Sequence, residues 1–196
     1  MNKVSRTRKM VATGMLSALA VALTFFPHFR VPLMPSFIKM DFSELPALIA
    51  SFAFGPVWGV AVCFVKNAIG ALTTSTGGVG ELSNFMLGCL FVVPAGLIYQ
   101  RGKNKKSAFF GAFAGAVIMG LASVITNYYI VYPVYTVFMP MEVIMGMYQA
   151  ILPSVKNLWQ ALIIFNMPFT FIKGMLNALI AMLIYKPISP ILKGKM

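Results

Sequence analysis

Long apolar runs with very few ionisable residues fill most of this chain, and no other feature constrains its fold as strongly. Residues 10–26, 82–99, 108–132 and 168–185 are each long enough to cross a bilayer as a helix. Their mixture of Gly, Ala, Met and Phe lacks the in–out alternation of a transmembrane β-strand. A mean hydropathy of +0.84 also lies outside the range of soluble domains. We therefore expect an all-α membrane protein, multi-pass in the cell membrane, with residues 1–196 forming a single integral-membrane domain.

Basic residues gather in three clusters that lie beside the apolar runs. The clusters occupy residues 3–9, 101–106 and 186–195. Lysine and arginine concentrate in the cytoplasmic loops and ends of membrane proteins, so this pattern indicates the orientation of the chain. It argues against nucleic acid as a partner, which a formal net charge of +12 would otherwise suggest.

Because all three clusters belong on the cytoplasmic side, an even number of crossings must separate each consecutive pair. Two shorter apolar pieces, residues 43–54 and 57–72, are broken at Gly55-Pro56, and each needs neighbouring helices to support a crossing. The last crossing is expected to begin at Pro168 rather than at Trp159, since proline is favoured in the first turn of a helix and disfavoured inside it. The chain then has six transmembrane helices with both termini cytoplasmic.

The segment between the last two crossings, residues 133–167, is expected to lie outside the membrane. Its methionines, aromatic residues and prolines suit a lid or an interfacial helix. The apolar run at residues 10–26 is preceded by basic residues, as in a signal peptide. No polar region with a cleavage site follows it, so we expect the run to be retained as the first transmembrane helix.

Polar and ionisable side chains interrupt the apolar runs at similar depths. Such groups are costly inside a membrane and usually mark functional sites. Counting about 1.5 Å per helical residue, they all fall in the outer half of the expected bundle. The set consists of Asp41, Glu44, Lys66, Asn67, Glu81, Asn84, Asn127 and Lys173. The sequence therefore predicts a substrate pocket near the extracellular face, with the stretch 37–46 as one of its walls.

Several of these residues also have plain structural interpretations. Lys66 and Glu81 could pair and hold two helices together, which is as good an interpretation as ligand contact for those two. Asn127 could bond between helices, and Lys39 could extend to lipid headgroups. Lys173 has no carboxylate within reach on its own helix, so a functional role is favoured for it.

Residues for catalysis, metal binding or nucleotide hydrolysis are missing. The single histidine, His28, cannot build a metal site or a triad, and no metal ligand set or cofactor is expected. Cys63 and Cys89 lie inside apolar runs and suit small buried hydrophobic positions. Gly77-Gly78-Val79-Gly80 is followed by Glu81 where a phosphate loop needs lysine. If the protein moves a solute against a gradient, another subunit must supply the energy.

Small residues recur every fourth position along the first run, at Gly14, Ala18 and Ala22. A stripe of this kind lets a second helix approach closely. Packing within the protein would use the same stripe, so the pattern alone does not establish a partner.

Five motifs, in order and with similar spacing, resemble the substrate-binding S components of energy-coupling factor (ECF) vitamin transporters, most closely those specific for riboflavin. The motifs are FIKMDFSELPALI at 37–49 with the FGP turn after it, FVKNAI at 64–69, GGVGELSNFMLG at 77–88, ITNYYIVYPVY at 125–135 and PFTFIKG at 168–174. The resemblance implies six helices and a vitamin pocket near the outer surface, capped by the loop after the first helix. Besides the lipid bilayer, it also implies riboflavin as the transported ligand, and a transmembrane coupling subunit and two ATPases as protein partners.

The resemblance further implies roles for particular residues. Asn127 and Lys173 would hydrogen-bond the ribityl and flavin polar atoms, and the 37–42 loop would cover the ring. The remaining candidates for substrate contact are Lys39, Asp41, Phe42, Glu81, Asn84, Phe85 and Thr170. Aromatic walls could come from Phe37, Phe42, Phe85, Tyr128 and Tyr132. The stripe Gly14, Ala18 and Ala22 would be the interface with the coupling subunit.

One position departs from the riboflavin-specific pattern, which has PFN where this chain has Pro168-Phe169-Thr170. Thr170 offers one hydroxyl in place of an amide and has a shorter reach. Asn166 could supply the missing amide only if the start of the helix is shifted from Pro168.

Three alternatives remain open from sequence. The same scaffold could bind another vitamin or a flavin-related compound. A small intramembrane enzyme could use Asp41, Lys66 and Glu81, although the lack of paired carboxylates and of a usable histidine disfavours catalysis. The chain could also be a structural membrane subunit.

Overall fold

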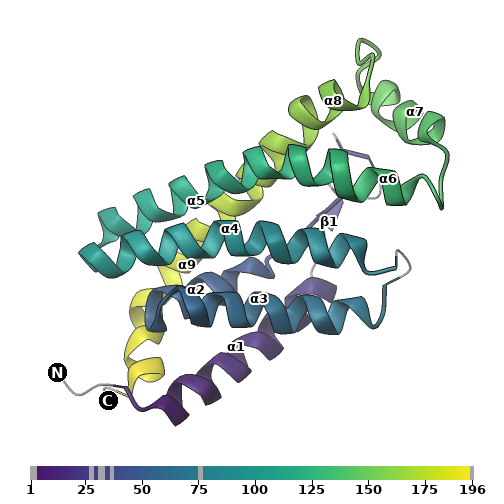
Figure 1. The fold of residues 1–196 in the computed structure, drawn as a ribbon. Helices are drawn as coiled ribbons and strands as arrows, with labels where there is room; N and C mark the ends of the chain where they lie inside the picture. The colour runs from purple at the N-terminus through teal and green to yellow at the C-terminus, as the bar shows by residue number, and fades with distance from the viewer. Residues whose placement is uncertain (1–3, 27–28, 31–33, 36–37, 75–76, 195–196) are drawn as a thin grey trace.

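The computed structural model describes residues 4–26, 29–30, 34–35, 38–74 and 77–194, and most of this backbone is helical. The helices lie alongside one another in an elongated bundle (Figure 1). The order of elements is α1 (Arg6–Phe25), β1 (Phe29–Arg30), β2 (Lys39–Met40), α2 (Glu44–Phe54), α3 (Pro56–Ala71), α4 (Val79–Gly102), α5 (Lys105–Thr126), η1 (Asn127–Val131), α6 (Tyr132–Tyr135), α7 (Met141–Ile151), α8 (Leu158–Ala161), η2 (Leu162–Asn166) and α9 (Met167–Lys193). The all-α class expected from the sequence is confirmed, with a two-residue antiparallel β1–β2 pairing as a small addition.

Within the part of the chain that the structure describes, four helical runs are long and apolar enough to cross a membrane. They are Arg6–Phe25, Val79–Gly102, Lys105–Tyr135 and Leu158–Leu192. Two shorter apolar helices, α2 and α3, pack within the same bundle. The predicted break between them is confirmed: Gly55 has φ 108°, a left-handed region that favours glycine, and Pro56 begins α3.

The core lies where α2, α3, α4, α5 and α9 meet. Phe52 of α2 and Phe91 of α4 are fully buried there together with Leu48 and Val62. Helices α4 and α5 approach closely because Gly111 has no side chain: a Cβ at that position would lie 2.7 Å from the Ala95 carbonyl oxygen. Close packing of small residues is the usual way in which membrane helices associate.

The last helical run starts at Leu158, so the predicted start at Pro168 is wrong. The wide turn η2 explains how the helix passes the proline. The Met167 N–H donates to the Leu162 carbonyl, five residues back, directly before Pro168. A proline ring clashes with the carbonyl four residues earlier in a regular α-helix, and the wider turn relieves that crowding. The expected outer excursion is correspondingly shorter, because helix resumes well before residue 167.

A matching wide turn extends the preceding helix. The Tyr132 N–H donates to the Asn127 carbonyl across η1, and Pro133 follows at once. The helical run that starts at Lys105 therefore continues to Tyr135. Between Tyr135 and Leu158 the chain forms α7, at the end of the bundle that also carries β1 (Figure 1).

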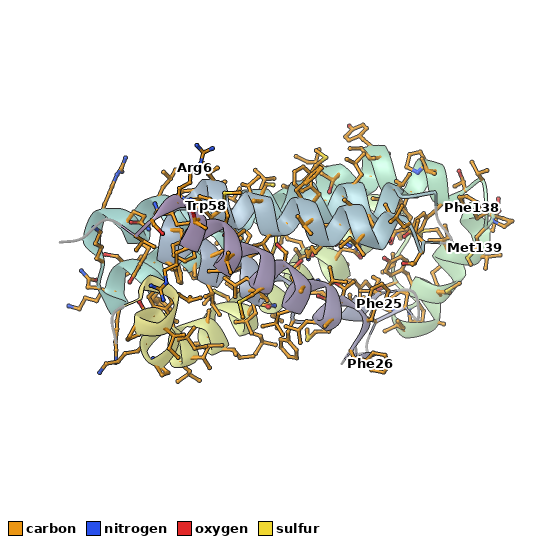
Figure 2. The ribbon with its side chains drawn as sticks, turned by 90° about the horizontal axis from the view of Figure 1, so that it is seen from below. Arg6, Phe25, Phe26, Trp58, Phe138 and Met139 are labelled. Atoms are coloured by element: carbon orange, nitrogen blue, oxygen red, sulfur yellow. The ribbon has the colours of Figure 1, made fainter. Side chains whose placement is uncertain are left out.

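The two ends of the bundle differ in chemistry. The start of α1, the α2–α3 turn, the α4–α5 turn and the end of α9 lie at one end (Figure 1). Figure 2 shows Arg6 and Trp58 at that end and Phe138 and Met139 at the other. The described parts of the three basic clusters are therefore gathered at one end, as the positive-inside pattern requires.

Candidate functional site

A cavity of about 430 Å³ opens among the helix ends near β2, at the end of the bundle remote from the basic clusters. Its polar lining comprises Thr24, Asp41, Glu44, Thr74, Glu81, Ser83, Asn84, Asn127, Tyr132, Tyr135, Asn166, Thr170 and Lys173. Its apolar lining includes Phe25, Ile38, Leu87, Met119, Val131 and Phe169. The residues come from α1, α2, α4, α5, η1, α6, η2, α9 and the loops beside them, so segments far apart in the sequence meet at the cavity. This is a concave site in which a few polar groups converge between apolar walls.

Four charged side chains form a buried network along one wall of the cavity. Lys173 Nζ lies 2.9 Å from Asp41 Oδ2 and 3.3 Å from Glu44 Oε2. Lys66 Nζ lies 2.8 Å from Glu44 Oε1. The side chains of Lys66 and Glu44 are 3% and 5% exposed, whereas those of Lys173 and Asp41 are 11% and 16% exposed. Lys173 and Asp41 are therefore the more exposed pair of the network, and they line the cavity together with Glu44.

Ser43 connects the two ion pairs. Its hydroxyl donates to Asp41 Oδ1 at 2.6 Å and accepts from Lys66 Nζ at 2.6 Å. The Ser43 backbone N–H also donates to Asp41 Oδ1. Burial alone would raise the pKa of the Asp41 carboxyl, but the ammonium groups of Lys173 and Lys66 hold it well below its usual range. Asp41 is thus ionised at neutral pH and fixes the position of Lys173.

These contacts correct the pairing considered from the sequence. Lys66 pairs with Glu44, so the Lys66–Glu81 pair is wrong. Glu81 lines the cavity instead, and its buried Oε2 accepts no hydrogen bond from the described residues. Buried polar atoms normally have a partner, so this oxygen is a candidate for contact with a ligand.

The two wide turns each bring an asparagine to the cavity. Asn127 is the first residue of η1 and Asn166 the last of η2, and both line the cavity with Thr170. Since the helix begins before Pro168, Asn166 and Thr170 lie one turn apart on one helical run. Because the helix starts before Pro168, Asn166 can supply the amide that the riboflavin-specific pattern has at position 170. Wide turns of this kind are frequent at functional sites.

Asn166 is held in place from α7. The buried Tyr148 hydroxyl donates to Asn166 Oδ1 at 2.8 Å. The same hydroxyl is hydrogen-bonded to the Tyr132 hydroxyl, which belongs to the cavity lining. Helix α7 therefore contributes to the site indirectly, by orienting two residues that line it.

The sequence candidates divide into three groups in the structure. Asp41, Glu81, Asn84, Asn127, Thr170 and Lys173 line the cavity, and so does the aromatic candidate Tyr132. Phe42, Phe85 and Tyr128 are not part of its described lining, and Phe85 packs edge-on against Phe64 with ring centroids 6.0 Å apart. Phe37 lies outside the described residues, as does the side chain of Lys39, whose backbone belongs to β2.

Residues beyond the candidates for substrate contact also contribute to the site, including Glu44, which the sequence placed in one wall of the pocket. Glu44 and Asn166 line the cavity, while Ser43 and Tyr148 position residues that do. Prolines 133 and 168 were the available signal for the wide turns that bring the two asparagines inward, since a proline within a helical pattern requires a local change in hydrogen bonding.

The small-residue stripe lies on the outer surface of α1. Gly14, Ala18 and Ala22 are all exposed, and a Cβ at Gly14 would meet nothing within 4 Å. The buried residues of α1, among them Leu16 and Ala20, lie on a different face. Packing among the described residues therefore does not use the stripe.

The apolar helices and the solute-sized cavity at one end define an integral membrane protein built to hold a small molecule. The family model for the ECF transporter substrate-specific component matches residues 8–185, and the chain belongs to that family. Its function is therefore transport rather than catalysis, which removes the intramembrane-enzyme alternative.

Two relatives and one solved structure within this family are similar to the chain over most of its length. The chain is 31% identical to the riboflavin transporter RibU of Staphylococcus aureus (strain TCH60), over 97% of this chain and 95% of that protein. It is 30% identical to the riboflavin transporter FmnP of Bacillus subtilis (strain 168), over 94% of each chain. A solved structure described as the S component of a bacterial ECF transporter superposes with a TM-score of 0.75 at 31% identity, covering 96% of this chain and 99% of the other.

Proposed function

We propose that this chain is a riboflavin-specific S component, which binds riboflavin at the outer face of the membrane for uptake by an ECF transporter. The observation that carries the proposal is the 430 Å³ cavity with converging polar groups between apolar walls. Pockets of roughly 300–1,000 Å³ are typical for ligands of this size. The names of the relatives support riboflavin as the particular ligand.

Riboflavin needs two kinds of surface, and the cavity has both. Its flat tricyclic ring needs apolar and aromatic contacts, which Phe25, Leu87 and Phe169 offer. Its ring edge and ribityl hydroxyls need several fixed donors and acceptors.

Particular residues suit these polar contacts. The amides of Asn127 and Asn166 and the hydroxyl of Thr170 can each donate or accept, and the free carboxylate oxygen of Glu81 can accept from ribityl hydroxyls. We assign Lys173 as the cationic contact, oriented by Asp41.

We further propose six membrane crossings with both termini cytoplasmic. Four long helical runs and the shorter pair α2 and α3 supply six candidates. The basic clusters at the end of the bundle opposite the cavity support a cytoplasmic position for that end, so that the cavity opens outward.

The exposed α1 stripe supports docking of the transmembrane coupling subunit at Gly14, Ala18 and Ala22. Backbone exposed at small residues allows another helix to approach closely. The energy for transport then comes from the two ATPase subunits of that module.

An uptake assay tests the proposal. The chain is expressed with a coupling subunit and its ATPases in a bacterium that neither makes nor imports riboflavin. Growth at low external riboflavin is expected with the full module and is lost when the coupling subunit is omitted. If the protein reaches the membrane but supports uptake only of a different vitamin, the assigned ligand is wrong.

A second candidate is a flavin-related compound, and Thr170 is the observation that favours it. The riboflavin-specific pattern has an amide at this position, so the geometry around the ligand must differ unless Asn166 replaces that contact. Competition between riboflavin and its precursors in the same uptake assay separates the two candidates.

A further inference from the structure

A second cavity, of about 390 Å³, opens at the opposite end of the bundle. It lies between the end of α2, the α4–α5 turn and the last turns of α9. Lys103 and Lys105 from the α4–α5 turn and Lys186 from α9 contribute to its lining. All three lysines are exposed, so their ammonium groups are accessible at the rim. The transport site does not include any of these residues.

No side-chain carboxylate of the chain neutralises these lysines. The four acidic residues are Asp41, Glu44, Glu81 and Glu142. Glu81 is in the first turn of α4, whereas Lys103 follows its end, and a 24-residue helix separates them by roughly 30 Å. Asp41 and Glu44 contact Lys173, which lies about 20 Å along α9 from Lys186 at 1.5 Å per residue. Glu142 belongs to α7, at the far end of the molecule.

The interior of the cavity is aromatic. Phe52, Tyr99 and Tyr185 pack against one another, with ring centroids 4.6 Å apart for Phe52–Tyr99 and 5.7 Å for Tyr99–Tyr185. The cavity thus combines a cationic rim with an apolar floor. A simple solvated lysine cluster on a convex turn would not have such a floor. The start of α5 adds a further positive partial charge from its helix dipole.

We propose that this cavity binds the headgroup of an anionic phospholipid, with its phosphate at the three lysines and its glycerol and upper acyl carbons against the aromatic floor. A lipid suits this site better than a soluble anion, because a ligand that fills it needs an apolar as well as an anionic part, and the proposed orientation puts this end of the bundle at the membrane interface. Basic pockets between transmembrane helices bind anionic headgroups in this way. Under the proposed orientation, the lipid belongs to the cytoplasmic leaflet.

The test compares lipid binding by three versions of the full chain in detergent: wild type, the cavity variant K103Q/K105Q/K186Q, and the control variant R6Q/R101Q/K106Q. The control removes the same charge from exposed positions at the same end that do not line the cavity. Phosphatidylglycerol and phosphatidylcholine are titrated separately, and bound lipid is counted by native mass spectrometry. Riboflavin binding checks that each variant is folded, independently of the lipid result.

Wild type and the control should retain one phosphatidylglycerol in preference to phosphatidylcholine, and the cavity variant should bind phosphatidylglycerol at least tenfold more weakly. Equal losses in both variants would indicate diffuse attraction and overturn the proposal. Equal binding of phosphatidylcholine would overturn it as well. Glycerol 3-phosphate serves as the soluble probe: if it displaces the lipid at comparable concentration, the site recognises a free phosphate and the lipid assignment is wrong.

Discussion

Replacing Lys173 by methionine should destabilise the protein strongly, and a second substitution should restore about half of the loss. Lys173 faces two carboxylates, Asp41 at 2.9 Å and Glu44 at 3.3 Å. Without Lys173, Lys66 is the one cation of the network left to balance the two carboxylates. Removing one partner of a buried ion pair costs about 3–5 kcal/mol, because the remaining charge stays buried. The free energy of unfolding of K173M should therefore fall by an amount in that range.

The compensating change is Asp41→Asn. In the double variant, Lys66 and Glu44 remain as a balanced pair 2.8 Å apart, and the asparagine carries no charge. Asp41→Asn by itself should destabilise the wild-type protein by about 1 kcal/mol, the low end for a lost buried hydrogen bond. The expected coupling energy is about 3 kcal/mol, the upper end of the range seen for residues in direct contact, so the double variant should be about 2 kcal/mol more stable than K173M alone.

Unfolding of the purified proteins in mixed detergent micelles measures these differences, with Lys156→Met as the control because Lys156 is exposed outside the network. The control should lie within about 0.5 kcal/mol of wild type. If the two substitutions combine additively within about 0.5 kcal/mol, Asp41 and Lys173 are not coupled and the description of the network is wrong.

Three further substitutions test other parts of the account. Asn127→Ala should weaken riboflavin binding by roughly 5–150-fold, since a lost buried hydrogen bond costs about 1–3 kcal/mol; an affinity within twofold of wild type would mean that the site is misplaced. Ala18→Leu should preserve binding but abolish uptake, whereas the exposed control Ala150→Leu on α7 should support both, and surviving uptake in the first variant would exclude α1 as the docking face. Tyr148→Phe should lower the free energy of unfolding by about 1–3 kcal/mol, because the buried acceptor of Asn166 loses its donor, and an unchanged stability would contradict the role given to α7.

The membrane class, the break at Gly55 and the depth of the polar residues follow from the sequence because hydropathy and helical rise determine them directly. The sequence does not show which charged side chains form ion pairs. The contact between Lys173 and Asp41 joins residues 132 positions apart, and it depends on how α9 packs beside the start of α2. Pattern along the chain carries no information on that packing.

The aromatic candidates show a second limit of predicting the site from the sequence. Helical periodicity could have excluded one of them, Phe85. Phe85 directly follows Asn84 on α4, and successive residues of a helix point about 100° apart. Ser83, Asn84 and Leu87 share the face of α4 that lines the cavity, and Phe85 lies about 100° beyond Asn84, outside that face, where it packs against Phe64 of α3. The wide turns η1 and η2 were not predictable in detail, because they depend on backbone hydrogen bonds five residues apart.

The most direct measurement is a fluorescence titration of riboflavin with the purified chain alone in detergent, without a coupling subunit or ATPases. Stacking of the flavin ring against aromatic side chains should quench its fluorescence, and the outer cavity should give saturation at one riboflavin per chain. Tight quenching with this stoichiometry, weakened in Asn127→Ala, is the predicted result. Folded protein that leaves riboflavin fluorescence unchanged would contradict the assignment of this cavity as a riboflavin site.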